Sequence, residues 1–336
     1  MPELPDVTVY VERLAAFTVG HALTGIRLVS PFVLRSVDPS PQALVGKRVT
    51  SVRRIGKRLV LGFEDDLYAV IHLMVAGRLR WRKPGAKLPG KLALGAFDFA
   101  HGMVLFTEAS KKKRASLHVV RGAAALADFD RGGLDVLTAT PASFAAALRA
   151  ENHTIKRALT DPTVLDGIGN AYSDEILWAA KMSPFRQTRA LSGDELTQVL
   201  HAAQATLTAW TDRLRAEVGE GFPEEVTAFR PEMAVHGKYR QPCPTCGDPV
   251  QRIVYADNEA NYCATCQTAG KLLADRALSR LLKANWPKTL EELEDKRRDR
   301  VAAAAALAPA AAPAHVSSSG PNVTENPPAA KRRTRR

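Results

Sequence analysis

The chain lacks an uninterrupted apolar run of about 18 residues, the length from which a membrane helix is inferred. Its first residues also lack the basic stretch and following apolar stretch of an export signal. We therefore expect an intracellular protein with no membrane partner. The 336 residues are nevertheless 46% hydrophobic, which is enough for two or three domains that each have a core.

Cysteine is scarce, and its four copies all fall in one segment. Cys243 and Cys246 form one C-x-x-C pair, and Cys263 and Cys266 form a second after sixteen intervening residues. This spacing is typical of a four-thiolate zinc ribbon with a hairpin between the pairs. Two disulfides are the alternative, but they need an oxidising compartment. Four protein ligands leave no open position for a reacting water, so we predict one structural Zn²⁺ per chain.

Acidic residues are too few to balance the basic ones, and the net charge is +12. Residues 296–336 carry nine Lys or Arg against two acidic residues, so this segment accounts for seven of those charges. Its Ala- and Pro-rich composition predicts a disordered basic tail. Basic clusters also lie within the rest of the chain, notably Lys111, Lys112, Lys113 and Arg114. They fit either a polyanionic partner or a solvated basic face.

The hydrophobic pattern divides the rest of the chain and predicts an α+β protein. Residues 6–20 have helical spacing and end at Gly20. Short β-rich runs from about 21 to 122 predict an antiparallel β-sandwich after that helix. A linker is expected at 123–141, and a helical domain capped by Ser143 at 142–225. The zinc finger should occupy 236–270.

A glycine-containing turn lies within the helical region, in the stretch DPTVLDGIGNAYSDE at 161–175. Gly167 and Gly169 allow a tight turn and close approach to a ligand. Asn170 can cap the following helix, whose free backbone amides form a candidate phosphate site. Lys156 on the preceding helix can reach the same phosphate. A helix hairpin that only needs glycine for packing is the alternative.

The chain opens Met-Pro-Glu, so removal of Met1 would leave the secondary amine of Pro2 as its terminus. An α-amine is far less protonated near neutral pH than a lysine side chain. Such an amine can attack a sugar aldehyde carbon and form an iminium ion, while Glu3 transfers protons. The alternative is that Pro2 only permits methionine removal.

Three elements occur in order: PELPDV at the start, IK followed by LTDPTVLDGIGNAYSDEIL, and the four-cysteine hairpin. Together, over roughly residues 1–270, they resemble the formamidopyrimidine-DNA glycosylase and endonuclease VIII family. The resemblance implies a two-layered β-sandwich with an N-terminal helix, a helix-two-turn-helix domain and a zinc finger. It also implies a monomeric, cytoplasmic or nucleoid-associated repair enzyme that acts on damaged double-stranded DNA.

The resemblance further implies the roles of particular residues. Pro2 would be the Schiff-base nucleophile, Glu3 the acid or base and Lys57 the β-strand lysine. Asn170 and Lys156 would hold the phosphate beside the lesion. Met74 would fill the gap left by the flipped nucleotide. The expected activity is removal of oxidised bases such as 8-oxoguanine, followed by strand cleavage at the abasic site, with no dissociable cofactor.

Two positions depart from the family pattern. The stretch TEASKKKRAS replaces the arginine and phenylalanine that fill the helix opposite the lesion, so Lys111 to Arg114 are expected to contact phosphates. Asn258 stands where the zinc hairpin usually carries a phosphate-binding arginine, and Arg252 is a possible substitute. These departures leave two alternatives open: a lyase specific for abasic or single-stranded DNA, or a non-catalytic zinc-ribbon DNA-binding protein.

Overall fold

The computed structural model describes residues 1–255, 258–274 and 286–307. Residues Met1–Leu290 form one compact unit and Glu291–Arg336 form a second. Within the described residues, no helix is both long enough and apolar enough to cross a membrane.

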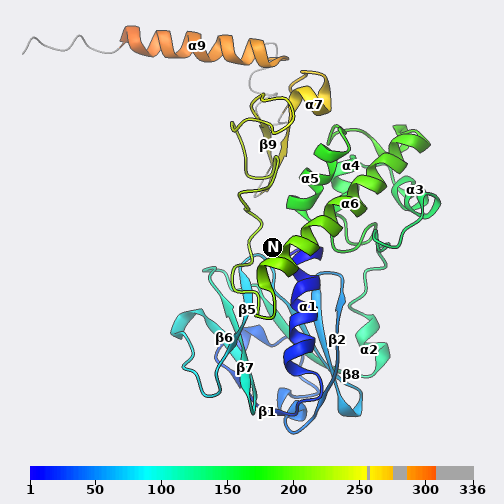
Figure 1. Cartoon of the computed structure of the whole chain (residues 1–336), viewed down its shortest axis with the longest axis vertical. Helices are drawn as coiled ribbons and strands as arrows, with labels where there is room; N and C mark the ends of the chain where they lie inside the picture. The colour runs from blue at the N-terminus through cyan, green and yellow to red at the C-terminus, as the bar shows by residue number, and fades with distance from the viewer. Residues whose placement is uncertain (256–257, 275–285, 308–336) are drawn as a thin grey trace, which may run out of the picture. The chain divides into compact units, whose positions relative to one another are not determined.

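The first unit opens with helix α1 (Leu4–Thr18), which packs on a sandwich of two four-stranded antiparallel sheets (Figure 1). One sheet has the strand order β1-β6-β7-β5 and the other β2-β3-β4-β8. The strands are β1 Leu23–Leu28, β2 Val49–Ile55, β3 Arg58–Phe63, β4 Leu67–His72, β5 Gly77–Arg82, β6 Ala93–Phe99, β7 Gly102–Glu108 and β8 Ser116–Arg121. Helix α1 ends at Thr18, two residues before Gly20, the residue at which the sequence predicted its end. Gly20 has a φ of 84°.

The sandwich core lies between the sheets, because alternate residues of each strand face inward. Leu59 and Leu61 of β3 pair with Ile71 and Ala69 of β4 and contribute to this core. Phe106 of β7 is fully buried in the same core. The expected β-sandwich with its N-terminal helix is confirmed.

The segment expected to be a linker contains a short helix, α2 (Ala123–Ala127). The outer face of β3 and β4 is apolar at Val60 and Val70, and Leu126 of α2 buries both side chains. An exposed apolar face on that sheet would be unfavourable, which explains a helix at residues expected to be linker.

The helical domain consists of α3 (Pro141–Ala150), α4 (Ile155–Thr160), α5 (Asn170–Ala179) and α6 (Gly193–Val218). Thr140 is the N-cap of α3, and Ser143, expected to be the cap, is its reciprocal partner three residues later. The core of this domain includes Phe144, Tyr172 and Leu200, and also Leu4 from α1. The start of α1 therefore belongs to the helical core and the rest of α1 to the sandwich core.

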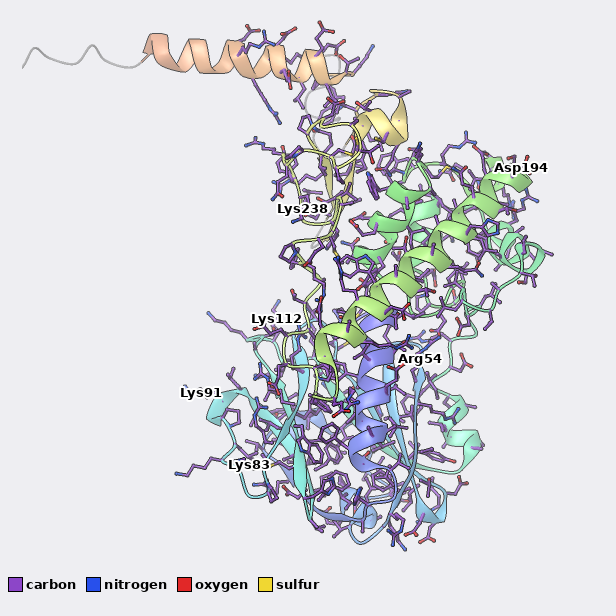
Figure 2. The ribbon with its side chains drawn as sticks, in the orientation of Figure 1. Arg54, Lys83, Lys91, Lys112, Asp194 and Lys238 are labelled. Atoms are coloured by element: carbon purple, nitrogen blue, oxygen red, sulfur yellow. The ribbon has the colours of Figure 1, made fainter. Side chains whose placement is uncertain are left out.

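An ion-pair cluster also joins the two domains. Arg54 of β2 binds Asp135 at 2.6 Å and Asp166 at 2.5 Å. Figure 2 labels Arg54 beside α1, on the strand side of the junction. Asp166 directly precedes the Gly167–Gly169 turn, so this cluster fixes the turn against the sandwich.

The zinc-finger part contains β9 (Gln251–Tyr255), β10 (Asn258–Tyr262) and α7 (Ala264–Thr268). Helix α9 spans Leu290–Leu307 and lies in the second unit from Glu291 onward. Residues 296–307 are thus helical, which differs from the disorder expected from residue 296 onward, because alanine and long charged side chains favour helix. Residues 308–336, the remainder of the expected tail, lie outside the described residues. Short 3₁₀ turns occupy Pro31–Val33, Pro41–Leu44, Glu64–Asp66, Gly90–Leu92 and Thr188–Ala190.

The buried ring of Phe106 provides a test of the sandwich core. Phe106→Ala should lower the free energy of unfolding by about 3–5 kcal/mol, since it removes apolar contacts and leaves a cavity. Phe32→Ala is the matched control, because the Phe32 side chain is 73% exposed. Urea denaturation of both variants measures the difference, and an equal effect of the two substitutions would contradict this core assignment.

Candidate active site

Pro2 and Glu3 are buried at the junction of the sandwich and the helical domain. Glu3 precedes α1, is 2% exposed, and its backbone N–H donates to Asp6 Oδ2 at 3.0 Å. The N–H of Leu4 donates to the carbonyl of Gly167 at 3.0 Å. These bonds fix the direction in which residues 1 and 2 leave the helix.

The carboxylate of Glu3 is held by the N-terminus of α5. Oε2 accepts from the N–H of Gly169 at 2.7 Å and of Tyr172 at 3.2 Å, and Oε1 accepts from Ala171 at 2.9 Å. The positive end of the helix dipole favours a negative charge at this position. Backbone amides that were expected to bind a phosphate are therefore occupied by a side chain of the protein.

Glycine is required where the turn meets the N-terminus. A Cβ at Gly169 would lie 2.5 Å from the carboxyl carbon of Glu3 and 2.8 Å from Lys57 Nζ. Gly167 has a φ of 81°, and a Cβ there would lie 2.8 Å from Leu4. The sequence expectation of a close approach at these glycines agrees with this geometry, but the group approached is Glu3.

Lys57 and Met1 line a cavity of about 210 Å³. Lys57 lies between β2 and β3, one residue before the strand on which it was expected. Burial lowers the pKa of the Lys57 ammonium, although Glu3 and Asp166 act in the opposite direction. Burial also lowers the pKa of the Met1 amine. The cavity therefore favours neutral amines, which are the nucleophilic form.

Two other titratable side chains near the N-terminus have shifted pKa values. Burial, together with the positive charges of Arg58 and Lys57, lowers the pKa of His72 in the same cavity to about 4. Burial raises the pKa of Asp6 to about 6. His72 is thus neutral at pH 7, and the junction combines an uncharged imidazole with a carboxyl that ionises near neutrality.

Lys156 is 5% exposed and lies in the first turn of α4. Its Nζ donates to the carbonyl of Asn170 at 2.7 Å and to Asp174 Oδ1 at 2.5 Å. The structure thus places Lys156 beside Asn170, as expected, but directs its ammonium toward α5.

Asn170 is the first residue of α5, whereas Gly169 occupies the N-cap position in which Asn170 was expected. The side-chain Nδ2 of Asn170 donates to the carbonyl of Glu259 in β10 at 2.8 Å. Asn170 therefore connects α5 to the zinc hairpin. Its position beside the Gly167–Gly169 turn is the one that the sequence indicated.

Met74 lies in the turn between β4 and β5, with a φ of 52°. Its side chain is half-buried, whereas the neighbouring Val75 is 60% exposed. Of these two apolar side chains, Val75 is therefore the more exposed to solvent. The positive φ at Met74 could not be inferred from sequence, since non-glycine residues seldom adopt it.

The basic run at 111–114 lies in the connection between β7 and β8. The carboxylate of Glu108, which is 1% exposed, accepts backbone N–H bonds from Arg114 and Ala115. Lys113 donates its ammonium to the carbonyl of Glu108. Lys111, Lys112 and Arg114 have exposed side chains, so three of the four expected phosphate contacts are accessible. Figure 2 labels Lys112 at the end of the sandwich where β7 connects to β8.

The loop after β5 carries further lysines on the sandwich surface. Lys87 and Lys91 are both exposed, and Ala86 and Leu88 pack on the outer face of the sheet. Figure 2 shows Lys83 and Lys91 pointing outward from this part of the sandwich.

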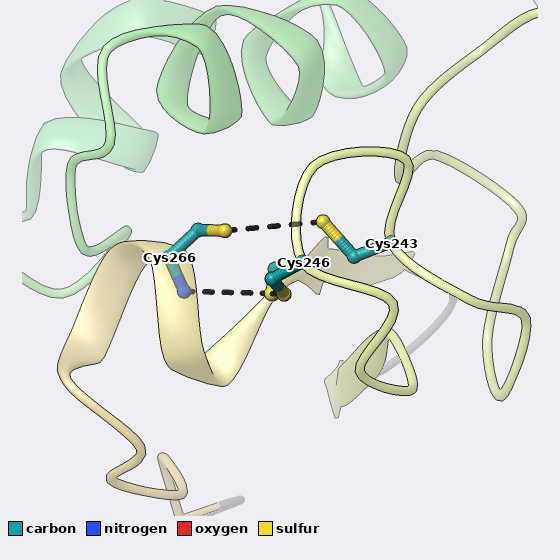
Figure 3. Close-up of side chains that lie close together, drawn as sticks. Cys243, Cys246 and Cys266 are labelled. Atoms are coloured by element: carbon teal, nitrogen blue, oxygen red, sulfur yellow. Dashed lines mark hydrogen bonds between the residues drawn. The ribbon is translucent and has the colours of Figure 1, made fainter.

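The four cysteines come together as a metal site. Their Sγ atoms all lie within 4.8 Å of one another, with Cys246 and Cys263 at 3.4 Å and Cys243 and Cys266 at 3.9 Å (Figure 3). A tetrahedral zinc with Zn–S bonds of about 2.3 Å has S–S separations of about 3.8 Å. The thiolates therefore fit Zn²⁺, and the site is structural because all four positions are filled by protein.

The hairpin beside the metal site carries the remaining candidates. Asn258 begins β10, but its side chain lies outside the described residues. Arg252 of β9 pairs with Glu259 at 3.4 Å, and its guanidinium lies 4.4 Å from the ring centre of Tyr239. Arg252, the suggested substitute for the missing arginine, is thus already paired with Glu259 of the same hairpin.

Two acidic residues of α5 make long-range contacts that the sequence did not indicate. Asp174 Oδ2 binds His236 Nδ1 at 2.8 Å, and the carboxylate of Glu175 accepts from the amides of Ala234, Val235 and His236. Nothing in the local sequence indicates these long-range pairs. Asp6 was also missed, although the Glu3-x-x-Asp6 spacing is a capping signal that could have identified it.

Family models match all three parts of this architecture. The formamidopyrimidine-DNA glycosylase N-terminal domain matches residues 1–119, its H2TH domain residues 135–213, and the zinc finger found in FPG and IleRS residues 240–269. A formamidopyrimidine-DNA glycosylase of Thermomicrobium roseum is 31% identical over 291 residues, covering 80% of this chain and 99% of the relative. The chain belongs to the formamidopyrimidine-DNA glycosylase family. Its expected fold class and zinc finger are thereby confirmed.

Other relatives agree with this membership. The formamidopyrimidine-DNA glycosylase of Chloroflexus aurantiacus is 30% identical over 276 residues, covering 80% of this chain and 98% of its own. An uncharacterized formamidopyrimidine-DNA glycosylase-like protein of Mycobacterium tuberculosis is 46% identical over 151 residues, covering 45% and 94%. Wild-type Lactococcus lactis Fpg, solved with DNA containing an oxidized pyrimidine, superimposes with a TM-score of 0.70 at 25% identity, covering 80% of this chain and all of that one.

Gly169→Ala should displace Glu3 while leaving the fold intact. Its Cβ would overlap the Glu3 carboxyl, and a displacement of about 1 Å at a reacting group can cost about 100-fold in rate. We expect that loss in DNA glycosylase activity on a damaged duplex, measured by gel electrophoresis after alkaline cleavage. Gly193→Ala in α6 is the matched control, because a Cβ there meets nothing within 4 Å. Equal activity of the two variants would contradict the assigned position of Glu3.

The metal site predicts a fixed zinc content. The purified protein should contain one Zn²⁺ per chain by elemental mass spectrometry, and Cys263→Ser should lose it, because that thiol is buried among the ligands. Binding of structural zinc supplies on the order of 10 kcal/mol to local folding. Thr245→Ala, between two ligands, should retain the metal. Full zinc content in the Cys263→Ser protein would refute the four-thiolate site.

Proposed function

We propose that this member of the formamidopyrimidine-DNA glycosylase family is a bifunctional enzyme. It excises oxidised bases and then cleaves the strand at the abasic site. The observation that carries the proposal is the burial of Pro2 and Glu3 beside Lys57, with the Glu3 carboxylate bound to three amides of α5. A purely structural N-terminus has no need of a carboxylate and a lysine amine that both lie against Gly169.

The nucleophile is the amine of Pro2, which becomes free when Met1 is removed. Because Met1 lines the cavity that also contains Lys57 and His72, its removal leaves the new terminus facing the same space. Burial that lowers the pKa of an amine favours its neutral form. The neutral amine donates its electron pair to C1′ of the damaged nucleotide.

The reaction then proceeds in covalent steps. The N–C1′ bond forms as the C1′–base bond breaks, and the base leaves with a proton. The Pro2 nitrogen, now bonded to C1′, gives its proton to the Glu3 carboxylate. Glu3 then passes this proton to O4′ as the C1′–O4′ bond opens and the iminium ion forms. The iminium acidifies the C2′ proton, and its removal expels the 3′ phosphate by breaking the C3′–O bond. Water later hydrolyses the iminium and releases the enzyme.

The remaining candidates bind the DNA around this centre. Lys111, Lys112 and Arg114 have exposed charges that can reach phosphates, and Lys113 positions their loop. Asn170, with Lys156 behind it, borders the turn that meets the lesion strand. Met74, in the turn between β4 and β5, fills the gap left by the flipped nucleotide, with the exposed Val75 beside it. Asn258 contacts the strand from the zinc hairpin, and the enzyme acts as a monomer.

A lyase with little base excision is the second candidate. It is favoured by the composition of the β7–β8 connection, which in residues 109–115 contains no aromatic side chain. A ring at this position would support the base opposite the lesion by stacking, whereas cations contact only phosphates.

Borohydride trapping tests the proposal. Protein whose Met1 has been removed, as verified by mass spectrometry, is mixed with duplexes that carry an oxidised purine, an oxidised pyrimidine or an abasic site. We expect a covalent adduct on at least one damaged base, since borohydride reduces the iminium to a stable amine. Adducts on abasic DNA alone would establish the lyase, and no adduct on any duplex would refute both enzymes.

The Pro2→Gly variant tests whether the nucleophile is the terminal amine or the amine of Lys57. A primary glycine amine in the same position should reduce the adduct at least about tenfold if Pro2 is the nucleophile, and Lys57→Met should preserve some adduct. An unchanged adduct with Pro2→Gly and its loss with Lys57→Met would instead assign Lys57 as the nucleophile.

A further inference from the structure

Helix α5 is bonded to the zinc-binding part, and to the residues that lead into it, along its whole length. Asn170 donates to Glu259 in the first turn, Glu175 accepts three amides of residues 234–236 in the second, and Trp178 reaches Cys243 in the last. Glu175 and Trp178, three positions apart, share one face of α5, and Asn170 contacts β10 from the first turn. The helix and the zinc-binding part are therefore joined at each turn.

Trp178 makes the contact closest to the metal site. Its Nε1–H donates to Sγ of Cys243 at 3.4 Å, and its ring packs with Val235 and Val250. A thiolate ligand accepts hydrogen bonds and donates none. The indole N–H therefore fixes the orientation of one zinc ligand and partly offsets its negative charge.

Gln267 supplies a second connection to the same end of α5. Its Oε1 accepts from the N–H of Cys263 at 2.8 Å, and its Nε2 donates to the carbonyl of Met182 at 2.9 Å. Met182 follows α5 by three residues. Cys243 is thus bonded directly to Trp178 of α5. Cys263 is bonded through Gln267 to Met182, just beyond the C-terminal end of the helix.

The opposite end of α5 holds Glu3. A helix of ten residues is about 15 Å long and behaves as a rod over that length. We propose that Trp178 is a positioning residue that links zinc binding to the placement of Glu3 through α5. The link to zinc stands on these contacts alone, while its consequence for catalysis rests on the proposed function of Glu3.

Zinc retention tests the first half of the proposal. Trp178→Phe keeps the aromatic bulk and removes the N–H, and loss of such an outer hydrogen bond costs about 10–100-fold in metal affinity. We expect a fall of that size, measured by competition with a chromogenic chelator on the full-length protein without DNA.

Trp210→Phe is the matched control. Trp210 lines the same cavity of about 720 Å³ as Trp178, but its described contacts are with Tyr172 and Arg213. Its zinc affinity should stay within about twofold of the wild type. Wild-type affinity in Trp178→Phe, or an equal loss in both variants, would overturn the proposal.

Hydrogen exchange tests the second half. The amides of Gly169, Ala171 and Tyr172 are bonded to Glu3, so chelation of zinc should accelerate their exchange at least about tenfold, and zinc-loaded Trp178→Phe should show a smaller acceleration. Unchanged protection of these amides after zinc removal would overturn the link to Glu3. Since neither measurement uses DNA, failure of borohydride trapping would leave this result intact and would count against the proposed function alone.

Discussion

The N-terminal amides of α5 bind the Glu3 carboxylate, and the arrangement of the rest of the site depends on this interaction. The bond joins residues separated by more than 160 positions in the chain. It fixes the first residues of the sandwich domain to the first turn of a helix in the other domain. Without it, the terminus would be a flexible end, as most chain termini are.

This interaction also determines which residues can do chemistry. The amides at the positive end of the α5 dipole hold the buried Glu3 carboxylate in place. Burial lowers the pKa values of the neighbouring amines. The junction therefore places a carboxylate held by three backbone amides beside amines that favour their neutral form.

Electrostatic pairing extends from this centre in two directions. Arg54, Asp135 and Asp166 hold the glycine turn against the sandwich. Lys156, Asp174 and His236 form a buried cluster on the other side of the turn, between α4, α5 and the zinc-finger part. Breaking the pair between Lys156 and Asp174 would leave a buried charge without its partner, which is strongly destabilising. The three parts of the protein therefore meet at α5.

The sequence alone determined the parts of this protein. Residue spacing predicted the zinc ligands, because metal geometry constrains C-x-x-C pairs strongly, and alternating apolar runs predicted the strands of the sandwich. The motifs around Pro2 and Asn170 located the junction, since they depend on short, local stretches. Only the tertiary structure decided which groups meet there: that Glu3 occupies the amides expected for a phosphate, that Lys156 faces Asp174, and that Trp178 reaches Cys243. These pairs join distant segments, and neither periodicity nor local spacing contains information about such contacts.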